Sequence, residues 1–209
     1  MPDALFNDIY ALFKNQLPAQ AIQAFHLRLA EKGAQVTQFQ LAVIPSSEHR
    51  EENDPVLQEL GLYLAPAVAQ QNNRVINYQT LSAVAARLGL LARILAVSWQ
   101  HLSCRKSFGV KTTKHQLIKA EFADISNHID ALLMQWQLRM AQADFAGAEE
   151  DHWQISVLTN RAEKLMGGHG YLLGNTHSLS YLSMMIYSLY GKSCCNEHLP
   201  QVENMEQQV

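Results

Sequence analysis

The carboxylate and histidine side chains whose spacing suits catalysis or metal binding lie in the second half of the chain. Glu149 and His152 form a Glu-x-x-His pair, the helical spacing with which ferritin-like bundles hold metal ions. Such a site needs a second pair of this kind and two further glutamates. Glu121, Asp124 and His128 share a helix face but do not repeat the spacing. We therefore expect no metal site, and interpret Glu149 as one of several acidic residues that favour a helix N-terminus.

Other reactive side chains are scattered. Cys104, Cys194 and Cys195 are odd in number and lack metal-ligand spacing, so they indicate neither a disulfide framework nor a zinc site, and a reducing cytoplasm is expected. His169 and His177 flank a glycine-rich turn, where structural histidines are more common than ligands. No nucleophile-histidine-acid arrangement or phosphate-binding glycine loop is recognisable, so we assign no catalytic residue.

The composition describes a soluble globular protein. The chain has 209 residues, 48% of them apolar, and a formal net charge of -3, which argues against disorder and against nucleic-acid binding. Its longest apolar stretch, Leu81 to Trp99, is interrupted by Arg87 and Arg93, and no basic region followed by an apolar one opens the sequence, so we expect no signal peptide. We expect no membrane span.

These residues need a scaffold, and the pattern predicts a helical one. Residues 1–55 form an N-terminal helical extension and polar linker: two amphipathic helices separated by Pro18, a loosely alternating segment at Gln35 to Ile44 that suits a strand, and a polar segment from Pro45 to Pro55. A helix at Val56 to Gln71, broken or bent near Pro66, follows.

The main domain is expected at residues 56–195, with a frayed tail at 196–209. Apolar residues recur at three- and four-residue intervals and predict four long helices, so the fold class is all-α and the architecture an antiparallel four-helix bundle. The predicted helices run from Asn77 to about Leu102, and over Lys114 to Ala143, Ala148 to Met166 and Ser178 to Tyr190. The last is apolar nearly all round, which predicts burial by its neighbours or by another subunit.

Two motifs sit at the ends of these helices. An Arg-x-x-Phe-Gly sequence at residues 105–109 follows the first, and Gly-Gly-His-Gly-Tyr at residues 167–171 joins the third and fourth. In this order, with Gly89, Gln116 and the Ala123-Asp124 pair, they resemble the C-terminal helical domain of acyl-CoA dehydrogenases over a little more than half of the chain.

The resemblance implies a flavin contact made across a subunit interface. In that family the motif arginine and phenylalanine reach FAD bound to a neighbouring subunit, and Arg105 and Phe108 occupy those positions. A guanidinium suits a pyrophosphate because its planar fork gives paired, charge-assisted hydrogen bonds. The alternative for Arg105 is a favourable interaction with a helix C-terminus. Gly167 and Gly168, the other candidate cofactor-binding residues, permit positive backbone angles in a tight turn with or without a ligand.

The departures from the family concern its catalytic base. The resemblance places this glutamate at Gly191 or, in some members, at Gln79, and neither residue accepts a proton at neutral pH. The flavin-contacting glutamine becomes Lys164, the Arg-Asp pair of the last helix becomes Leu182-Ser183, and the Gly-Thr pair becomes Lys192-Ser193.

Most of the family's flavin cleft is also missing. Only about 75 residues precede the bundle, too few for the middle β domain and the N-terminal helical domain. We therefore expect a non-catalytic or accessory acyl-CoA dehydrogenase-like protein, without FAD in the isolated chain. It would act by self-association as a homodimer or homo-oligomer, or by docking to a complete acyl-CoA dehydrogenase-type partner subunit. The alternative is an FAD-dependent oxidoreductase acting on the CH-CH group of an acyl thioester, alone or with a partner.

Overall fold

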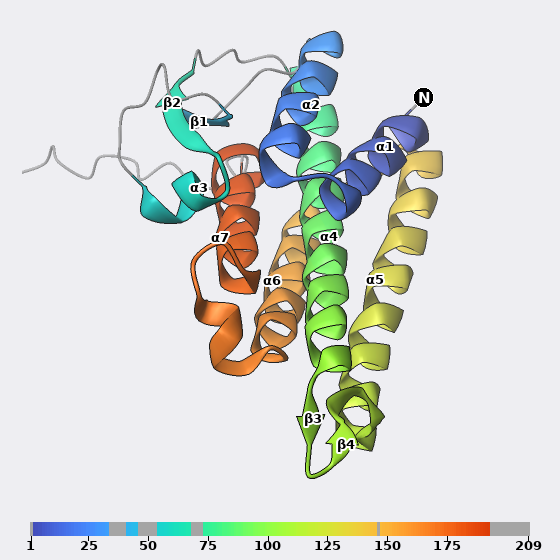
Figure 1. Cartoon of the computed structure of the whole chain (residues 1–209). Helices are drawn as coiled ribbons and strands as arrows, with labels where there is room; N and C mark the ends of the chain where they lie inside the picture. The colour runs from blue at the N-terminus through green and yellow to red at the C-terminus, as the bar shows by residue number, and fades with distance from the viewer. Residues whose placement is uncertain (1, 34–40, 46–53, 68–72, 146, 193–209) are drawn as a thin grey trace, which may run out of the picture.

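The computed structural model describes residues 2–33, 41–45, 54–67, 73–145 and 147–192 (Figure 1). Within them the protein is all-α apart from two short antiparallel strand pairs, as the sequence predicts at the level of fold class. Seven α-helices are present, in the order α1 (Pro2–Asn15), α2 (Pro18–Glu31), α3 (Pro55–Glu59), α4 (Asn73–Cys104), α5 (Gln116–Gln142), α6 (Ala148–Lys164) and α7 (Thr176–Ile186).

The two amphipathic N-terminal helices are confirmed. Pro18 is the first residue of α2. The amide at this position has no partner within a helix, so the hydrogen that proline lacks is not missed, and Pro18 starts α2 directly after the short link from α1. Phe13 of α1 and Phe25 of α2 meet edge to face with ring centroids 5.7 Å apart. The apolar faces of both helices belong to the same hydrophobic cluster as the long helices that follow.

The predicted strand is present in part, as β1 (Leu41–Ile44), while its residues 35–40 lie outside the described part of the chain. It pairs antiparallel with β2 (Tyr63–Pro66). The predicted helix at Val56 to Gln71 is therefore correct only in its first turn and wrong from residue 60 to residue 67, while residues 68–71 lie outside the described part of the chain. The side chain of Asp54 caps α3 by accepting hydrogen bonds from the amides of Val56 and Leu57, but Gly61, with φ of 70°, ends the helical path and turns the chain into β2.

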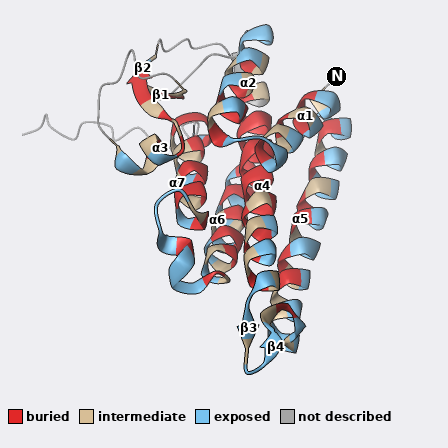
Figure 2. Ribbon diagram, in the orientation of Figure 1, coloured by how far each residue is buried: buried red, intermediate tan, exposed pale blue. Residues whose placement is uncertain are grey.

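Helix α4 is the centre of the molecule, and Figure 2 shows it buried over most of its length. Every residue from Gln79 to Leu91 is buried, because α1, α6 and α7 all pack on it. Gly89 explains how α1 comes so close: a Cβ there would lie 2.6 Å from the carbonyl oxygen of Tyr10 and 2.8 Å from the Cβ of Phe13. Glycine is required at this crossing for packing.

The α4 segment Tyr78–Cys104 is long and apolar enough to cross a membrane by length and composition alone. Its most apolar window is 83% buried inside the fold, as in the core helix of a water-soluble protein.

The remaining long helices agree with the predicted ones to within a few residues. Helix α5 lies at one edge and uses one stripe for the core, while α6 and α7 complete the packing around α4 (Figures 1 and 2). Between α6 and α7 the glycine-rich segment Gly167–Tyr171 (η2) forms a 3-10 turn. The predicted fourth helix starts two residues earlier than expected and ends in a π-helical turn, Tyr187–Gly191 (η3). The buried stripe of α5 consists of Phe122, Ile125, Ile129, Leu132, Trp136 and Met140.

Candidate functional site

The Arg-x-x-Phe-Gly motif folds as a small hairpin that projects from the end of α4, away from α1 and α2 (Figure 1). Strands β3 (Lys106–Ser107) and β4 (Val110–Lys111) pair antiparallel, with Ser107 opposite Val110, so that only two residues make the turn. Both turn residues have positive φ, 51° at Phe108 and 77° at Gly109, as a type I′ turn requires. The hairpin continues through a 3-10 turn (η1, Thr112–Lys114) into α5.

Phe108 is an unusual residue for this place. Asparagine or glycine is favoured at the first position of a type I′ turn, because a larger side chain is strained at positive φ. Phe108 is also 97% exposed, so no packing against the described residues compensates for the strain. A strained aromatic side chain held in solvent is the kind of local conflict that marks a functional position.

Arg105 lies at the base of this hairpin. Its carbonyl oxygen accepts a hydrogen bond from the backbone amide of Thr112 at 2.9 Å, which closes the hairpin against the end of α4. Its guanidinium is exposed and lies 3.4 Å from Nε2 of His101, one helical turn earlier. The side chain is thus held at the surface within the described residues.

The glycine turn lies beside this same end of α4. The imidazole rings of His101 and His169 stack, with centroids 4.5 Å apart and planes inclined by 12°. Gly167 has φ of 59°, and an added Cβ at Gly167 or Gly168 would meet nothing within 4 Å. The structure therefore brings all four predicted cofactor-binding residues to one exposed end of the molecule.

The hairpin end is strongly cationic. Residues 105–119 contain Arg105, Lys106, Lys111, Lys114 and Lys119 and no acidic residue, although the whole chain has a net charge of -3. Lys106 and Lys111 face each other across the strand pair, an arrangement of like charges that weakens a hairpin. Partial desolvation, followed by the proximity of His169 and Arg105, lowers the pKa of His101. This surface is electrostatically suited to an anionic partner.

A second polar cluster lies in the core and was not singled out by the sequence pattern. Arg87, at its centre, is 0% exposed. Its guanidinium donates to neutral acceptors at the side chains of Ser183, Ser156 and Met184 and at both Nδ1 and the carbonyl oxygen of His152. The ring of Tyr187 lies 5.1 Å from its central carbon. The cation is thus accommodated by hydrogen-bond acceptors on two neighbouring helices, α6 and α7.

The cluster fixes the protonation of both residues at its centre. Desolvation lowers the pKa of Arg87 to about 10, and desolvation together with the Arg87 charge lowers the pKa of His152 to about 3. His152 is therefore neutral, and because Nδ1 accepts from Arg87, its proton is on Nε2. That atom has no hydrogen-bond partner within the described residues, and a Cβ at Gly191 would lie 2.7 Å from it. Gly191 is needed to leave room for the imidazole.

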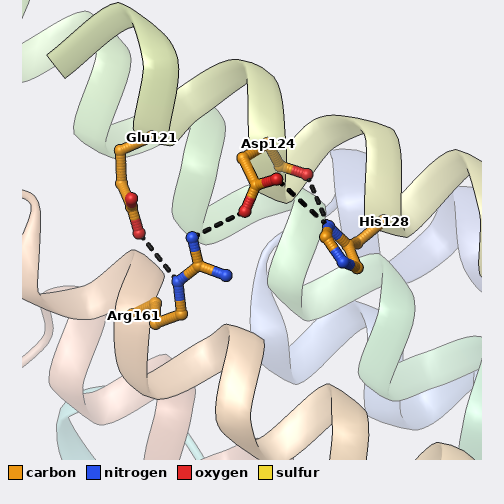
Figure 3. A network of polar contacts seen from close by, with 4 residues as sticks. All are labelled: Glu121, Asp124, His128 and Arg161. Atoms are coloured by element: carbon orange, nitrogen blue, oxygen red, sulfur yellow. Dashed lines mark hydrogen bonds and ion pairs between the residues drawn. The ribbon is translucent and has the colours of Figure 1, made fainter. Parts of the chain in front are cut away.

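The carboxylates considered as metal ligands have other partners. Figure 3 shows Arg161 of α6 between Glu121 and Asp124 of α5, at 2.8 and 2.7 Å, with His128 packed against Asp124. Arg161, more than His128, holds the pKa of the Asp124 carboxyl below its usual value, chiefly through its hydrogen bond. These contacts tie α5 to α6.

Glu149 accepts a hydrogen bond from the hydroxyl of Tyr187, while His152 turns toward Arg87, so the Glu-x-x-His pair does not converge. Within the described residues no three His, Cys, Asp or Glu side chains are grouped as metal ligands would be. Cys104 is exposed at the end of α4, and the other two cysteines lie outside the described part of the chain.

Sequence reasoning located the hairpin through its motif but gave no sign of its exposure or strain. Arg87 was visible only as a charge interrupting an apolar helix, and the signal that singles it out is a cation at a position where every helical neighbour predicts burial.

Compared with known proteins, the chain matches no family model and no curated protein.

Proposed function

We propose that this protein is a non-catalytic or accessory relative of the acyl-CoA dehydrogenases, which acts by self-association or by docking to a complete flavoenzyme subunit. The observation that carries the proposal is Phe108, an aromatic side chain that is 97% exposed and held at positive φ. Among the residues that the structure describes, nothing packs on this side chain, and its backbone is strained. Insertion into another protein surface gives the side chain a partner.

The surroundings of Phe108 support docking. Arg105 at the base of the hairpin carries a planar guanidinium group that is always positively charged, and the neighbouring lysines extend the positive surface. Interfaces draw their affinity from a few aromatic and arginine residues surrounded by weaker contacts. The family resemblance points the same way, because its motif arginine and phenylalanine act on the neighbouring subunit.

The residues at the family's base positions support a non-catalytic role. Gln79 is 1% exposed within α4 and carries no ionisable oxygen, and Gly191 is packed against His152. Close by, Arg87 and His152 fill the space between α4, α6 and α7 with hydrogen-bonded side chains. An acyl thioester would need a carboxylate base beside its α carbon.

One observation favours the alternative, an FAD-dependent oxidoreductase acting on the CH-CH group of an acyl thioester. Arg105, Phe108, Gly167 and Gly168 lie at one end of the molecule with their outer sides open, so a flavin held by another subunit could be contacted there. In that case the partner supplies the rest of the cleft and the catalytic base.

The test uses the purified full chain. We expect colourless protein that stays colourless after incubation with FAD, with no reduction of an electron acceptor by acyl-CoA. We also expect self-association, or binding to a purified complete acyl-CoA dehydrogenase, which Phe108→Ala weakens at least tenfold. Leu27→Ala is the control, because Leu27 is 59% exposed on α2, distant from the hairpin. Yellow protein that is bleached by an acyl-CoA would establish the alternative, and equal binding by both variants would contradict a docking role for Phe108.

A further inference from the structure

The outer face of α5 carries a second hydrophobic stripe, opposite the one that packs in the core. Leu117 is 86% exposed, Met134 69% and Leu138 59%, although all three are large apolar side chains. They belong to a series of positions separated alternately by three and four residues, all exposed except Asp124, which is half-buried beside Arg161 of α6. This is the heptad spacing of a helix that packs against another helix. The series is Leu117, Ala120, Asp124, Asn127, Ala131, Met134, Leu138 and Ala141.

The stripe is complementary to itself when two copies run antiparallel. Centring the pair near Ile129 places Leu117 opposite Ala141 of the second copy, and Ala120 opposite Leu138. A large side chain then meets a small one at both ends of the seam, as interdigitated packing requires. Nearer the middle, Met134 lies opposite Asp124, whose carboxylate is paired with Arg161 of its own chain, a cation that it shares with Glu121.

Charge selects the antiparallel arrangement over the parallel one. The cationic residues 105–119 contribute five positive charges to a chain of net -3, so the remaining residues sum to -8. Four acidic residues lie around the other end of α5, whose 27 residues span about 40 Å. They are Asp144 just after α5, Glu149 and Glu150 in the first turn of α6, and Asp3 in the first turn of α1. Parallel copies would bring the two cationic hairpins together, whereas antiparallel copies place each hairpin at the acidic end of its partner.

We infer that the chain forms an antiparallel homodimer through the outer stripe of α5, in which Lys114 of each copy lies beside Asp144 of the other. This inference rests on the proposed function and names the partner as a second copy. The dimer is isologous, so every contact occurs twice and every substitution is felt twice. It also brings Phe108 of each copy toward Asp144, Glu149 and Glu150 of the other.

Charge reversal tests the arrangement, with mass measured by light scattering after gel filtration at low and at moderate salt. Lys114→Glu alone and Asp144→Lys alone each place like charges opposite one another, and we expect each to raise the dimer dissociation constant about tenfold or more. Mixing the two variants in equal amounts restores the dimer. At one contact the introduced glutamate then faces the introduced lysine, and at the other the unchanged Lys114 faces the unchanged Asp144. A chain carrying both substitutions also dimerises.

Leu138→Ala tests the apolar contact between the two α5 helices. Leu27→Ala is its control, since both leucines are 59% exposed and Leu27 lies on α2. Because Leu138 is buried twice, we expect a loss of about a hundredfold in affinity, and none for the control. All these positions are solvent-facing, so circular dichroism and thermal unfolding should show intact folding. A monomeric wild type, or a mixture that stays monomeric, overturns the antiparallel dimer. If that monomer still binds a complete acyl-CoA dehydrogenase through Phe108, the proposed function stands; if it binds neither, both fail.

Discussion

Replacing Phe108 with asparagine should stabilise the fold and weaken association at the same time. The left-handed conformation costs an ordinary residue roughly 1–2 kcal/mol, whereas asparagine adopts it readily. Because Phe108 is 97% exposed at φ of 51°, the substitution removes that strain and loses almost no burial. We expect the free energy of unfolding to rise by about 1 kcal/mol, or about 2–4 °C in Tm for a chain of this size.

Thermal unfolding of the variant, at a concentration where the wild type is monomeric, measures the first effect without a contribution from assembly. Ala143→Asn is the matched control for strain, since Ala143 is the other non-glycine residue with positive φ in the described part of the chain, at 54°. It should gain a similar amount of stability. Val110→Asn, next to the turn but without positive φ, should gain none.

The second effect is read from the dissociation constant of the assembly, where Phe108→Asn should cost at least tenfold. A lower Tm would mean that Phe108 packs on the protein in solution, and the strain argument would be refuted. A raised Tm with unchanged association would leave the strained turn without a role in docking. Only the combination of higher stability and weaker assembly fits the reasoning.

Three further predictions concern the core, the first with Gly168→Ala at an exposed position as its control. Gly89→Ala should destabilise by more than about 2 kcal/mol in denaturant unfolding because α1 must move, while Gly168→Ala, with open space around it, should change stability by less than about 0.5 kcal/mol. Burial lowers the pKa of His26 to about 4 and of His152 to about 3, so below pH 6.5 the unfolded chain binds more protons than the folded chain. The free energy of unfolding from these two groups should therefore fall as the pH is lowered through 6.5, by about 4 kcal/mol at pH 5, and stop falling near pH 3 to 4. Denaturant unfolding repeated at several pH values measures this fall. Arg87→Lys should cost about 2–4 kcal/mol in the same assay, since three rotating donors replace a planar group with five.

Helical periodicity was enough to find the long helices, because each buries a continuous stripe that repeats every three or four residues. It failed at residues 60–66, although Leu60, Leu62 and Leu64 recur every second residue, which is the period of a strand and not of a helix. The deciding features were Gly61 and the pairing of Tyr63–Pro66 with Leu41–Ile44, a contact between segments some twenty residues apart that local pattern does not encode.

The candidate site was predictable only in part. The motif located Arg105 and Phe108, and the glycine turn located Gly167 and Gly168, but their nearness depends on His101 stacking with His169 across two elements. The Arg87 cluster was not predictable, since its acceptors come from α6 and α7, some 65 to 97 residues later in the chain. Its recognition requires knowing which helices meet.

That cluster has a consequence for how the helices find their native alignment. A slip of α6 along α4 by one helical turn, about 5.4 Å, would carry Nδ1 and the carbonyl oxygen of His152 out of reach and leave a buried guanidinium short of acceptors. Apolar side chains of similar size tolerate such a slip with little loss, whereas an incompletely hydrogen-bonded charge does not. Arg87 thereby penalises misaligned compact states during folding, and we expect the core to reach one packing arrangement rather than several of comparable energy.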